Sequence, residues 1–347
     1  MTVISTSYSG KLMSRRILLP VVLALAAAAV TAISLNGGDA QARTQDSKLT
    51  LVAYSTPREA YAKIIPEFQK TAKGKDVSFE QSYGSSGEQA RAVRSGLKAD
   101  IVALSLEPDI TTLVKAGLVN PKWKQNKWEG IVTRSVVVFA VRKGNPKKIK
   151  DWEDLVRKDV DVVTPNVQTS GGAKWNVMAA YGAMRKKGRT HKQAVAYLRN
   201  LYKHVVSQDK SARESLQTFT GGKGDILIAY ENEVLTAQQE GEDLEYVIPD
   251  QTILIENPVA VTSESESPEQ ARAFVDFLRS PEAQRVFAQN GYRPVVGDVL
   301  AEFDYLTPPA LFTIDDLGGW PEVTRRFFNV QSGVMADINR EVGAPTE

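Results

Sequence analysis

The sequence predicts an α/β protein with two lobes, on the basis of three observations. Short β-branched runs alternate with amphipathic helical stretches along most of the chain, a pattern typical of helices packed on a largely parallel sheet. Two long extended runs, at 131–141 and 253–262, interrupt this alternation and suggest that the chain crosses twice between two parts. The chain has 347 residues, which is more than one compact core usually supports. We therefore expect two lobes joined by two crossover segments.

The first series of predicted elements contains three strands and three helices. Pro57 stands at a favoured first position of a helix, and Gly96 and Gly117 are typical of helix ends. Asp109 is the expected cap of the third helix. The predicted strands are 49–54, 77–83 and 99–104, and the predicted helices are 57–68, 87–96 and 109–117.

The second series follows the turn Lys143-Gly144-Asn145-Pro146. Its predicted strands are 160–164 and 225–230, and its predicted helices are 172–187, 192–204 and 211–219. The C-terminal part adds helices at 268–279 and 281–289 and one last helix at 321–340. We predict that residues 43–137 and 252–347 form the first lobe and that residues 138–251 form the second.

The N-terminus has the three parts of a secretory signal peptide. A basic region precedes an apolar, alanine-rich run, and small residues follow at a spacing typical of a cleavage site; these parts are Lys11, Arg15 and Arg16, residues 17–33, and Ala40-Gln41-Ala42. We predict that residues 1–42 are removed and that the protein is exported. A retained membrane anchor is the alternative, which Pro20 and the many alanines disfavour. The arginine pair leaves both general and twin-arginine export open.

Composition excludes several classes of function. Removing residues 1–42 takes three of the 43 basic and one of the 41 acidic residues, so 40 of each remain. A net charge near zero gives no support for nucleic-acid or membrane-surface binding. The chain contains no cysteine, which excludes disulfides, thiolate metal sites and a cysteine nucleophile. Because the net charge is near zero, any bound anion must be held by the local arrangement of hydrogen-bond donors.

Three serine-containing loops, two of them also rich in glycine, are the candidate site. Ligands of α/β folds lie beyond the carboxyl ends of strands, which here means the loops after Tyr54, Tyr83, Thr164, Gln208 and Tyr230. Residues 84–87 (GSSG), 164–173 (TPNVQTSGGA) and 209–213 (DKSAR) each lead into a predicted helix. A helix N-terminus presents unpaired N–H groups and a positive partial charge. Each loop alone is typical of a simple helix cap, but three aimed at one cleft would form an anion site.

Other chemistries fit the sequence poorly. Ser86 resembles a nucleophile elbow, but its spacing departs from G-x-S-x-G. The two histidines, His191 and His204, lie on a basic helical stretch that is typical of a solvated face, so a serine hydrolase lacks a base. Neither glycine-rich loop continues as a nucleotide P-loop, and no histidine spacing suggests a catalytic metal. We predict no enzyme activity, no metal and no cofactor.

The chain resembles the periplasmic sulfate-binding proteins of ABC transporters, with thiosulfate-binding proteins as near relatives. The resemblance extends from about Leu49 nearly to the C-terminus. The segments that carry it are 82–87 (SYGSSG), 141–146 (VRKGNP), 164–166 (TPN), 169–173 (TSGGA), 228–233 (IAYENE), 280–284 (SPEAQ), 292–294 (YRP), 311–315 (LFTID) and 318–320 (GGW).

This resemblance implies a two-lobed venus-flytrap fold of type II, with sulfate buried between the lobes and held by uncharged donors. The implied ligands are the hydroxyls of Ser86, Ser170 and Tyr230 and the backbone N–H groups of Gly171, Gly172 and Ala212. Tyr230 stands where the family has tryptophan, so a phenol replaces an indole donor, and how it does so is open. Tyr83, Ser85 and Arg213 have uncertain or indirect roles beside these ligands, and Arg58 and Arg134 are further candidates for positive charge near the cleft.

The resemblance also implies partners and a location. The protein would be a periplasmic monomer that delivers sulfate to the membrane permease subunits of an ABC transporter. Thiosulfate, or another tetrahedral oxyanion such as molybdate, is the alternative ligand. Sulfate offers only acceptors at neutral pH, whereas phosphate keeps a proton and needs a carboxylate acceptor. We therefore expect the acids nearest the loops, Glu88, Asp209 and Glu231, to point away from the anion.

Overall fold

The computed structural model describes residues 47–344. The predicted signal peptide at 1–42 lies outside these residues. Within them, no helix combines the length and the apolar character that crossing a membrane requires.

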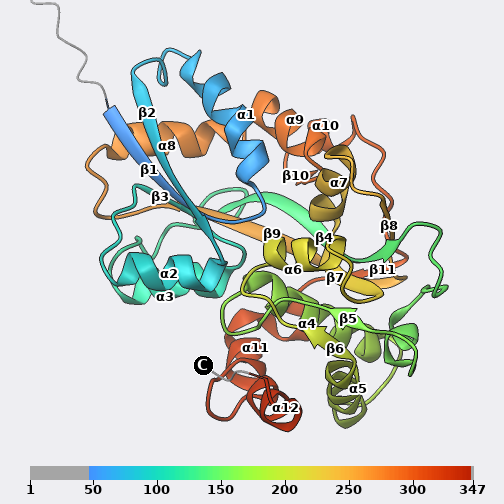
Figure 1. Cartoon of the computed structure of the whole chain (residues 1–347). Coiled ribbons are helices and arrows are strands. Elements are labelled where there is room, and N and C mark those ends of the chain that lie inside the picture. The colour runs from blue at the N-terminus through green and yellow to red at the C-terminus, as the bar shows by residue number, and fades with distance from the viewer. Residues whose placement is uncertain (1–46, 345–347) are drawn as a thin grey trace, which may run out of the picture. The chain divides into compact units, whose positions relative to one another are not determined.

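The elements alternate between strands and helices, as the sequence predicts (Figure 1). The strands are β1 (Ser47–Tyr54), β2 (Val77–Gly84), β3 (Ile101–Ala103), β4 (Ile131–Arg142), β5 (Val162–Val163), β6 (Val205–Ser207), β7 (Ile226–Tyr230), β8 (Leu244–Val247), β9 (Gln251–Val261), β10 (Arg293–Pro294) and β11 (Ala310–Phe312). The α-helices are α1 (Arg58–Gln69), α2 (Ser86–Arg94), α3 (Glu107–Lys115), α4 (Gly171–Lys186), α5 (His191–Lys203), α6 (Ala212–Thr220), α7 (Glu231–Gln239), α8 (Pro268–Phe277), α9 (Pro281–Gln289), α10 (Gly297–Leu300), α11 (Gly319–Phe327) and α12 (Val334–Val342). Two 3₁₀ helices lie at Trp152–Val156 and Asp315–Leu317.

The two predicted series have the same strand order. The sheet path is β2-β1-β3-β9-β4-β7-β5-β6, so the first half reads β2-β1-β3-β9 and the second, from its other end, β6-β5-β7-β4. In each half the three short strands pair in parallel and the fourth, long strand pairs antiparallel. The predicted α/β class is confirmed, and the carboxyl ends of the parallel strands mark the site in each half.

The long strands β4 and β9 are the predicted crossover segments. They pair with each other at one end of β4, from Ile131 to Val136. Beyond this point β4 pairs with β7 and β8, while the far end of β9, from Val259 to Val261, pairs with β3. Each strand therefore contributes to both halves of the sheet.

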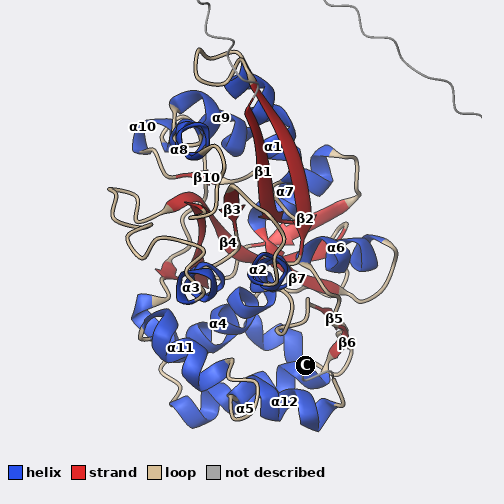
Figure 2. Ribbon diagram, turned by 90° about the vertical axis from the view of Figure 1, so that its left-hand side faces the viewer, coloured by secondary structure: helices blue, strands red, loops and turns tan. Residues whose placement is uncertain are grey.

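Helices cover both faces of the sheet, because side chains of a strand alternate between faces. In β1, Leu51 packs with α1, α8 and α9, while the next residue, Val52, packs with α2 and α3. In β4, Val137 faces α4 and α5, while Val138 faces α6 and α7. Strands that are apolar on both faces are typical of such a three-layer arrangement, and Figure 2 shows helices on either side of the strands.

The C-terminus differs from the prediction in two ways. The single helix predicted at 321–340 is two helices, α11 and α12, separated by a turn in which the Asn329 side chain accepts the N–H groups of Gln331 and Ser332. These helices also pack in the cluster formed by α4 and α5, through Trp320 and Met335 among others. The C-terminal helices therefore pack with the second series, whereas the sequence prediction assigned them to the first lobe.

Candidate functional site

The predicted ligands lie where strands end and helices begin. Ser86 is the first residue of α2, Ser170 caps α4, Ala212 is the first residue of α6, and Tyr230 ends β7. Ser86, Ser170 and Tyr230 are buried. The first N–H groups of a helix have no partner within that helix, so each start presents hydrogen-bond donors and a positive partial charge.

Gly172 brings the start of α4 against three other predicted ligands. A side-chain carbon added to Gly172 would lie 3.4 Å from Ser170 Oγ, 3.4 Å from Ala212 Cβ and 3.5 Å from the Tyr230 hydroxyl oxygen. The N-termini of α4 and α6 and the end of β7 therefore meet at one place. The donors that the sequence points to are neighbours in space, which is the geometry an anion site requires.

Ser86 is connected to Tyr230 through Ser105, in the loop after β3. Ser86 Oγ accepts a hydrogen bond from the Ser105 backbone N–H at 2.9 Å and donates one to Asp109 Oδ2 at 2.6 Å. Ser105 Oγ lies 2.6 Å from the Tyr230 hydroxyl oxygen. All four residues are buried. Predicted ligands of the first and second series thus belong to one hydrogen-bonded cluster.

Neither Ser105 nor Asp109 is among the ligands predicted from the sequence. Their position in the chain is the signal that could have found them. Ser105 and Asp109 follow β3, and the carboxyl end of this parallel strand is another place where ligands bind. A serine hydroxyl has one proton, and Ser86 donates it to Asp109 here. Ser86 can donate to an anion only by giving up Asp109, whose other carboxylate oxygen lies 3.9 Å from Lys174 Nζ.

Burial keeps the phenols of this region neutral. Burial raises the pKa of Tyr230 well above its usual value, and the neighbouring Tyr54 raises it further. Burial likewise raises the pKa of Tyr54 to about 12. Both groups are therefore protonated at neutral pH and able to donate hydrogen bonds.

Arg213 forms ion pairs and does not add free positive charge to the site. Its Nε donates to Glu233 Oε1 at 2.5 Å, and its two terminal nitrogens donate to the two oxygens of Glu59, each at 2.8 Å. Burial alone would lower the pKa of Arg213, but the charges and hydrogen bonds of Glu233 and Glu59 raise it. The guanidinium joins α6 and α7 of the second series to α1 of the first.

The other candidates of uncertain role have partners of their own. The Ser85 hydroxyl donates to Glu88 at 2.6 Å, and the Tyr83 hydroxyl donates to exposed Gln81 at 2.7 Å. Arg58 lies over the Tyr83 ring, 4.6 Å from its centroid. Arg134 Nε donates to Glu256 at 3.2 Å. These contacts give each of the four residues a local partner.

The three acids that we expect to point away from the anion have hydrogen-bond partners of their own. Glu88 accepts the Ser85 hydroxyl. Asp209 accepts the hydroxyls of Ser207, Ser215 and Thr218. Glu231 is held by Arg293 through two hydrogen bonds of 2.7 and 2.9 Å. Each of these carboxylates thus takes part in a local hydrogen-bond network.

Backbone contacts also join the two series beside the site. The Gly87 N–H donates to the Thr169 carbonyl at 2.9 Å, and Arg91 Nη1 donates to the Gln168 carbonyl at 3.2 Å. Figure 2 shows α2 and α4 close to one another, in agreement with these contacts. The start of α2 therefore rests on the loop that leads into α4.

The Glu59–Arg213 pair predicts an acid-sensitive contact. Burial raises the pKa of Glu59, but the hydrogen bonds and charge of Arg213 outweigh it, so the pKa lies below its ordinary value of 4.5. A lowered pKa stabilises the folded state above pH 4.5, and this contribution is lost as the pH falls through the pKa of the folded state. We expect Glu59→Gln to flatten the loss of stability below pH 4.5, measured by urea unfolding at several pH values. Glu67→Gln, which alters an exposed pair with Lys70 in the same helix, is the control. Equal pH profiles for wild type and Glu59→Gln would contradict the assignment.

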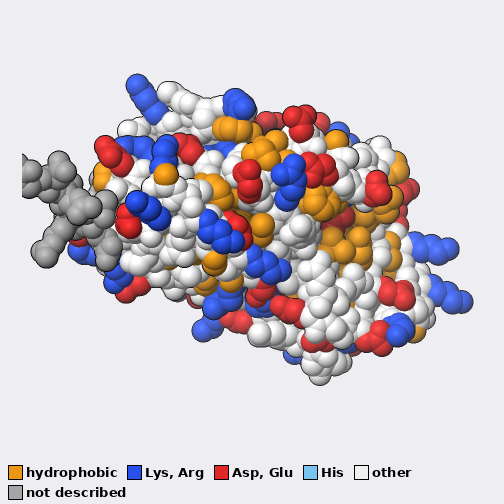
Figure 3. Space-filling view, turned by 90° about the horizontal axis from the view of Figure 1, so that it is seen from above, with side chains coloured by type: hydrophobic (Ala, Val, Ile, Leu, Met, Phe, Trp, Pro, Cys, Tyr) orange, Lys and Arg blue, Asp and Glu red, His pale blue; other side chains and the backbone are white. Residues whose placement is uncertain are grey.

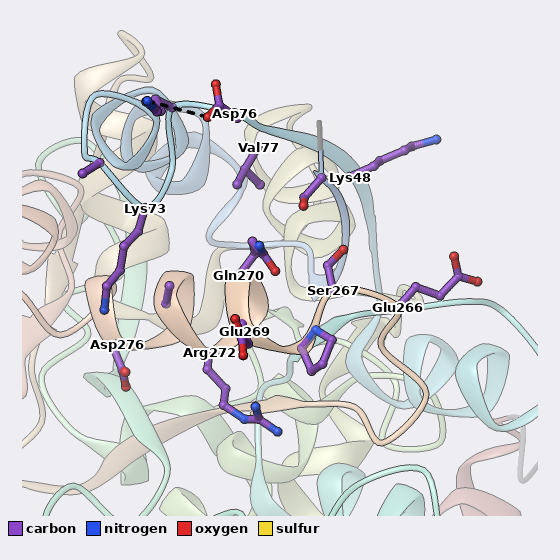
Figure 4. Close-up of a pocket in the computed structure, with 15 residues that line it drawn as sticks. Lys48, Lys73, Asp76, Val77, Glu266, Ser267, Glu269, Gln270, Arg272 and Asp276 are labelled. Atoms are coloured by element: carbon purple, nitrogen blue, oxygen red, sulfur yellow. Dashed lines mark ion pairs between the residues drawn. The ribbon is translucent and has the colours of Figure 1, made fainter. Parts of the chain in front are cut away.

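Cavity size does not identify the site. A cavity of about 10 Å³, room for roughly one water-sized sphere, is lined by Gly172, Asn176, Ala212, Tyr230 and Glu233, among others. A pocket of about 1140 Å³ lies between the start of β2 and α8 (Figure 4). Lysine and arginine alternate with aspartate and glutamate around it, and such mixed charge is also seen over one face of the molecule in Figure 3. None of the predicted ligands lines this pocket.

Comparison with known proteins agrees with this geometry. The family described as "Bacterial extracellular solute-binding protein" matches residues 49–293. A sulfate-binding protein of Synechococcus elongatus is 45% identical over 322 residues, covering 88% of this chain and 91% of that protein. A thiosulfate-binding protein of Escherichia coli is 36% identical and covers 82% and 89%.

A solved structure extends the agreement to the fold. The sulfate-binding protein SubI from Mycobacterium tuberculosis is 42% identical, with a TM-score of 0.80, and the match covers 82% of this chain and all of that chain. A periplasmic thiamin binding protein, 18% identical with a TM-score of 0.65, shares the fold alone. The two-lobed periplasmic-binding-protein fold is thereby confirmed. The chain belongs to the bacterial extracellular solute-binding protein family, in the group that contains the sulfate-binding proteins.

Proposed function

We propose that this chain is the solute-binding component of a sulfate ABC transporter, which closes two lobes around sulfate. The observation that carries the proposal is the meeting of α4, α6 and β7 at Gly172, with Ser170 Oγ and the Tyr230 hydroxyl beside it. Relatives named as sulfate-binding proteins support the choice of ligand. A binding role without catalysis is also supported by the cluster itself, because Ser86 is paired with Asp109 and not with a histidine base.

The chemistry of the cluster suits a fully ionised oxyanion. Burying a dianion without partners would cost tens of kcal/mol, so many donors must converge on it. Hydrogen bonds to a charged group contribute about 1.5–3 kcal/mol each. The proposed donors are the hydroxyls of Ser170 and Tyr230 and the N–H groups of Gly171, Gly172 and Ala212. Ser86 joins them when its proton turns from Asp109 to the anion.

The proposed motion is a hinge between the lobes. Residues 43–137 with most of 252–347 would form one lobe and residues 138–251, with the C-terminal helices α11 and α12 packed on them, the other. The hinge would lie in β4 and β9, the strands that contribute to both halves. The closed form would be the one that membrane permease subunits recognise. The protein would act as a monomer in the periplasm after removal of residues 1–42.

Ser170→Ala tests the proposed pocket. The substitution removes one donor to a buried charge, so we expect sulfate binding to weaken by about 1–3 kcal/mol in calorimetric titration. Ser170 also caps α4 by accepting the Ala173 N–H, so the variant loses some stability as well. Ser280→Ala is the matched control, because Ser280 caps α9 in the same way through the Ala283 N–H but lies outside the site. Equal sulfate affinity in Ser170→Ala and wild type would contradict the pocket.

Thiosulfate is the second candidate ligand, because relatives named as thiosulfate-binding proteins are also similar to this chain. Titration of the same protein with sulfate, thiosulfate, phosphate and molybdate in an anion-free buffer distinguishes the ligands. We expect sulfate to bind most tightly and phosphate weakly, since Glu88, Asp209 and Glu231 are held in local networks. Tight binding of phosphate would show that a carboxylate beside the site, such as Asp109 or Glu233, accepts its proton, and would overturn the choice of sulfate.

A further inference from the structure

Ser105 is the most highly connected residue of the cluster. Its N–H donates to Ser86 Oγ, and its carbonyl accepts hydrogen bonds from Trp175 Nε1 and Asn257 Nδ2, both at 3.0 Å. Its hydroxyl lies 2.6 Å from the hydroxyl of Tyr230. Every polar group of Ser105 therefore has a partner, and two of the four partners, Trp175 and Tyr230, belong to the second series.

The two hydroxyls have different surroundings. The Tyr230 hydroxyl faces the place where Gly172, Ser170 and Ala212 meet. Ser105 Oγ lies on the side of Gly171, where an added side-chain carbon would be only 2.5 Å from it. Tyr230 therefore borders Gly172, Ser170 and Ala212, whereas the Ser105 hydroxyl borders Gly171.

We infer that Ser105 is a positioning residue that sets the direction of the Tyr230 proton for anion binding. Two hydroxyls that share one hydrogen bond use one of their two protons in it. When Ser105 donates to Tyr230, the phenol proton is left to point at the anion. A chain of two hydroxyls also strengthens the second bond, because each dipole polarises the next. This inference rests on the proposed function and explains how a phenol can serve as the donor at this position.

The surroundings of Ser105 leave little room for a water molecule that could replace its hydroxyl. The residue is buried, and Gly171 and Leu106 crowd it, since a carbon added to Gly171 would meet both side chains at less than 3 Å. A water molecule could replace the hydroxyl only if these neighbours moved. Loss of the Ser105 hydroxyl should therefore leave the Tyr230 proton without a fixed direction.

A double-mutant cycle in sulfate titration tests the inference. We expect Ser105→Ala to weaken sulfate binding about 10-fold and Tyr230→Phe about 10- to 100-fold, the range for one bond to a charged group. The double variant should bind no more weakly than Tyr230→Phe, because Ser105 acts through Tyr230. Losses that add in the double variant, or an unchanged affinity in Ser105→Ala, would overturn the inference.

A spectroscopic readout separates this role from a structural one. Sulfate should change the ultraviolet absorption of Tyr230, seen as a difference signal that Tyr230→Phe removes. Ser105→Ala should reduce or shift that signal, whereas Ser78→Ala, at an exposed serine, should leave it intact. Should Ser105→Ala fail to fold, Ser105→Cys keeps the volume with a weak donor and should give an intermediate affinity and signal. Failure of the wild type to bind sulfate would refute the proposed function, whereas wild-type binding with an unaltered Tyr230 signal in Ser105→Ala would refute this inference alone.

Discussion

Replacing Gly171 with alanine is expected to weaken sulfate binding by up to about 100-fold. The new methyl group would lie 2.2 Å from Leu106 Cδ2 and 2.5 Å from Ser105 Oγ, far inside van der Waals contact. Gly171 belongs to the start of α4, whereas Ser105 and Leu106 follow β3 of the first series. The clash therefore acts where the two series meet and separates the proposed donors. Overpacking of this kind costs about 1–3 kcal/mol, and the upper end corresponds to about 100-fold in affinity.

The same argument predicts that the lobes of this variant remain folded. Thermal unfolding of Gly171→Ala without sulfate should stay close to that of the wild type, while calorimetry shows the loss of binding. Gly297→Ala is the control, because a carbon added there meets nothing within 4 Å and Gly297 does not have the backbone conformation that favours glycine. Sulfate affinity within threefold of the wild type in Gly171→Ala would show that the two segments separate freely in the bound state.

Local sequence signals account for the parts of the structure that were predictable. The sequence predicts Pro57 at the first position of this helix, and Pro57 is its N-cap residue, one residue before the start of α1. Ser170 precedes α4 and accepts the Ala173 N–H, as a capping serine does. These signals act over a few residues, so the helix starts that carry the proposed donors can be located without knowing the fold.

The pairs that complete the site depend on residues distant in sequence. Ser86 and Asp109 are 23 residues apart, and Ser105 and Tyr230 are 125 residues apart. Arg213 follows Ala212 at a helix start, which suggests a charge near the anion, yet its partner Glu59 is 154 residues away. Periodicity and capping carry no information on such pairs, since only the strand order brings the loops together.

The C-terminal helices illustrate a second limit. Residues 321–340 have helical periodicity throughout, but the Asn329 side chain bonds to the backbone two and three residues later and ends the helix. Phe327 and Ile338 then pack on α4 and α5. The break thus has a local cause, whereas the packing of both helices on α4 and α5 depends on residues distant in sequence.

Replacing Arg293 with methionine is expected to destabilise the protein by about 3–5 kcal/mol. Arg293 and Glu231 form two hydrogen bonds of 2.7 and 2.9 Å, and the pair is almost fully buried, with side-chain exposures of 8% and 2%. Removing one partner leaves the other charge buried without compensation, which is why the loss is large. Arg293 also donates to the Leu306 carbonyl and lies over the Tyr305 ring, so the methionine variant loses these contacts as well.

Arg285→Met provides a matched comparison for this prediction. Arg285 and Glu302 also form two hydrogen bonds, both of 2.7 Å, but their side chains are 45% and 41% exposed. Solvent screens an exposed pair, so urea unfolding should show a small change in Arg285→Met and a large one in Arg293→Met. Similar losses of unfolding free energy in the two variants would mean that burial is not the reason why the Arg293–Glu231 pair stabilises the protein.

A second substitution shows whether Arg293→Met destabilises the protein through the buried unpaired charge or through lost packing. Arg293→Met combined with Glu231→Leu removes both charges from the buried position, and we expect it to recover much of the stability lost in Arg293→Met. Glu231 directly follows Tyr230 and begins α7, so the pair also fixes the helix start behind the proposed phenol donor. Because the double variant keeps an apolar anchor there, it should regain sulfate binding together with stability. Recovery of stability without recovery of binding would show that the charge pair positions Tyr230 in addition to holding α7.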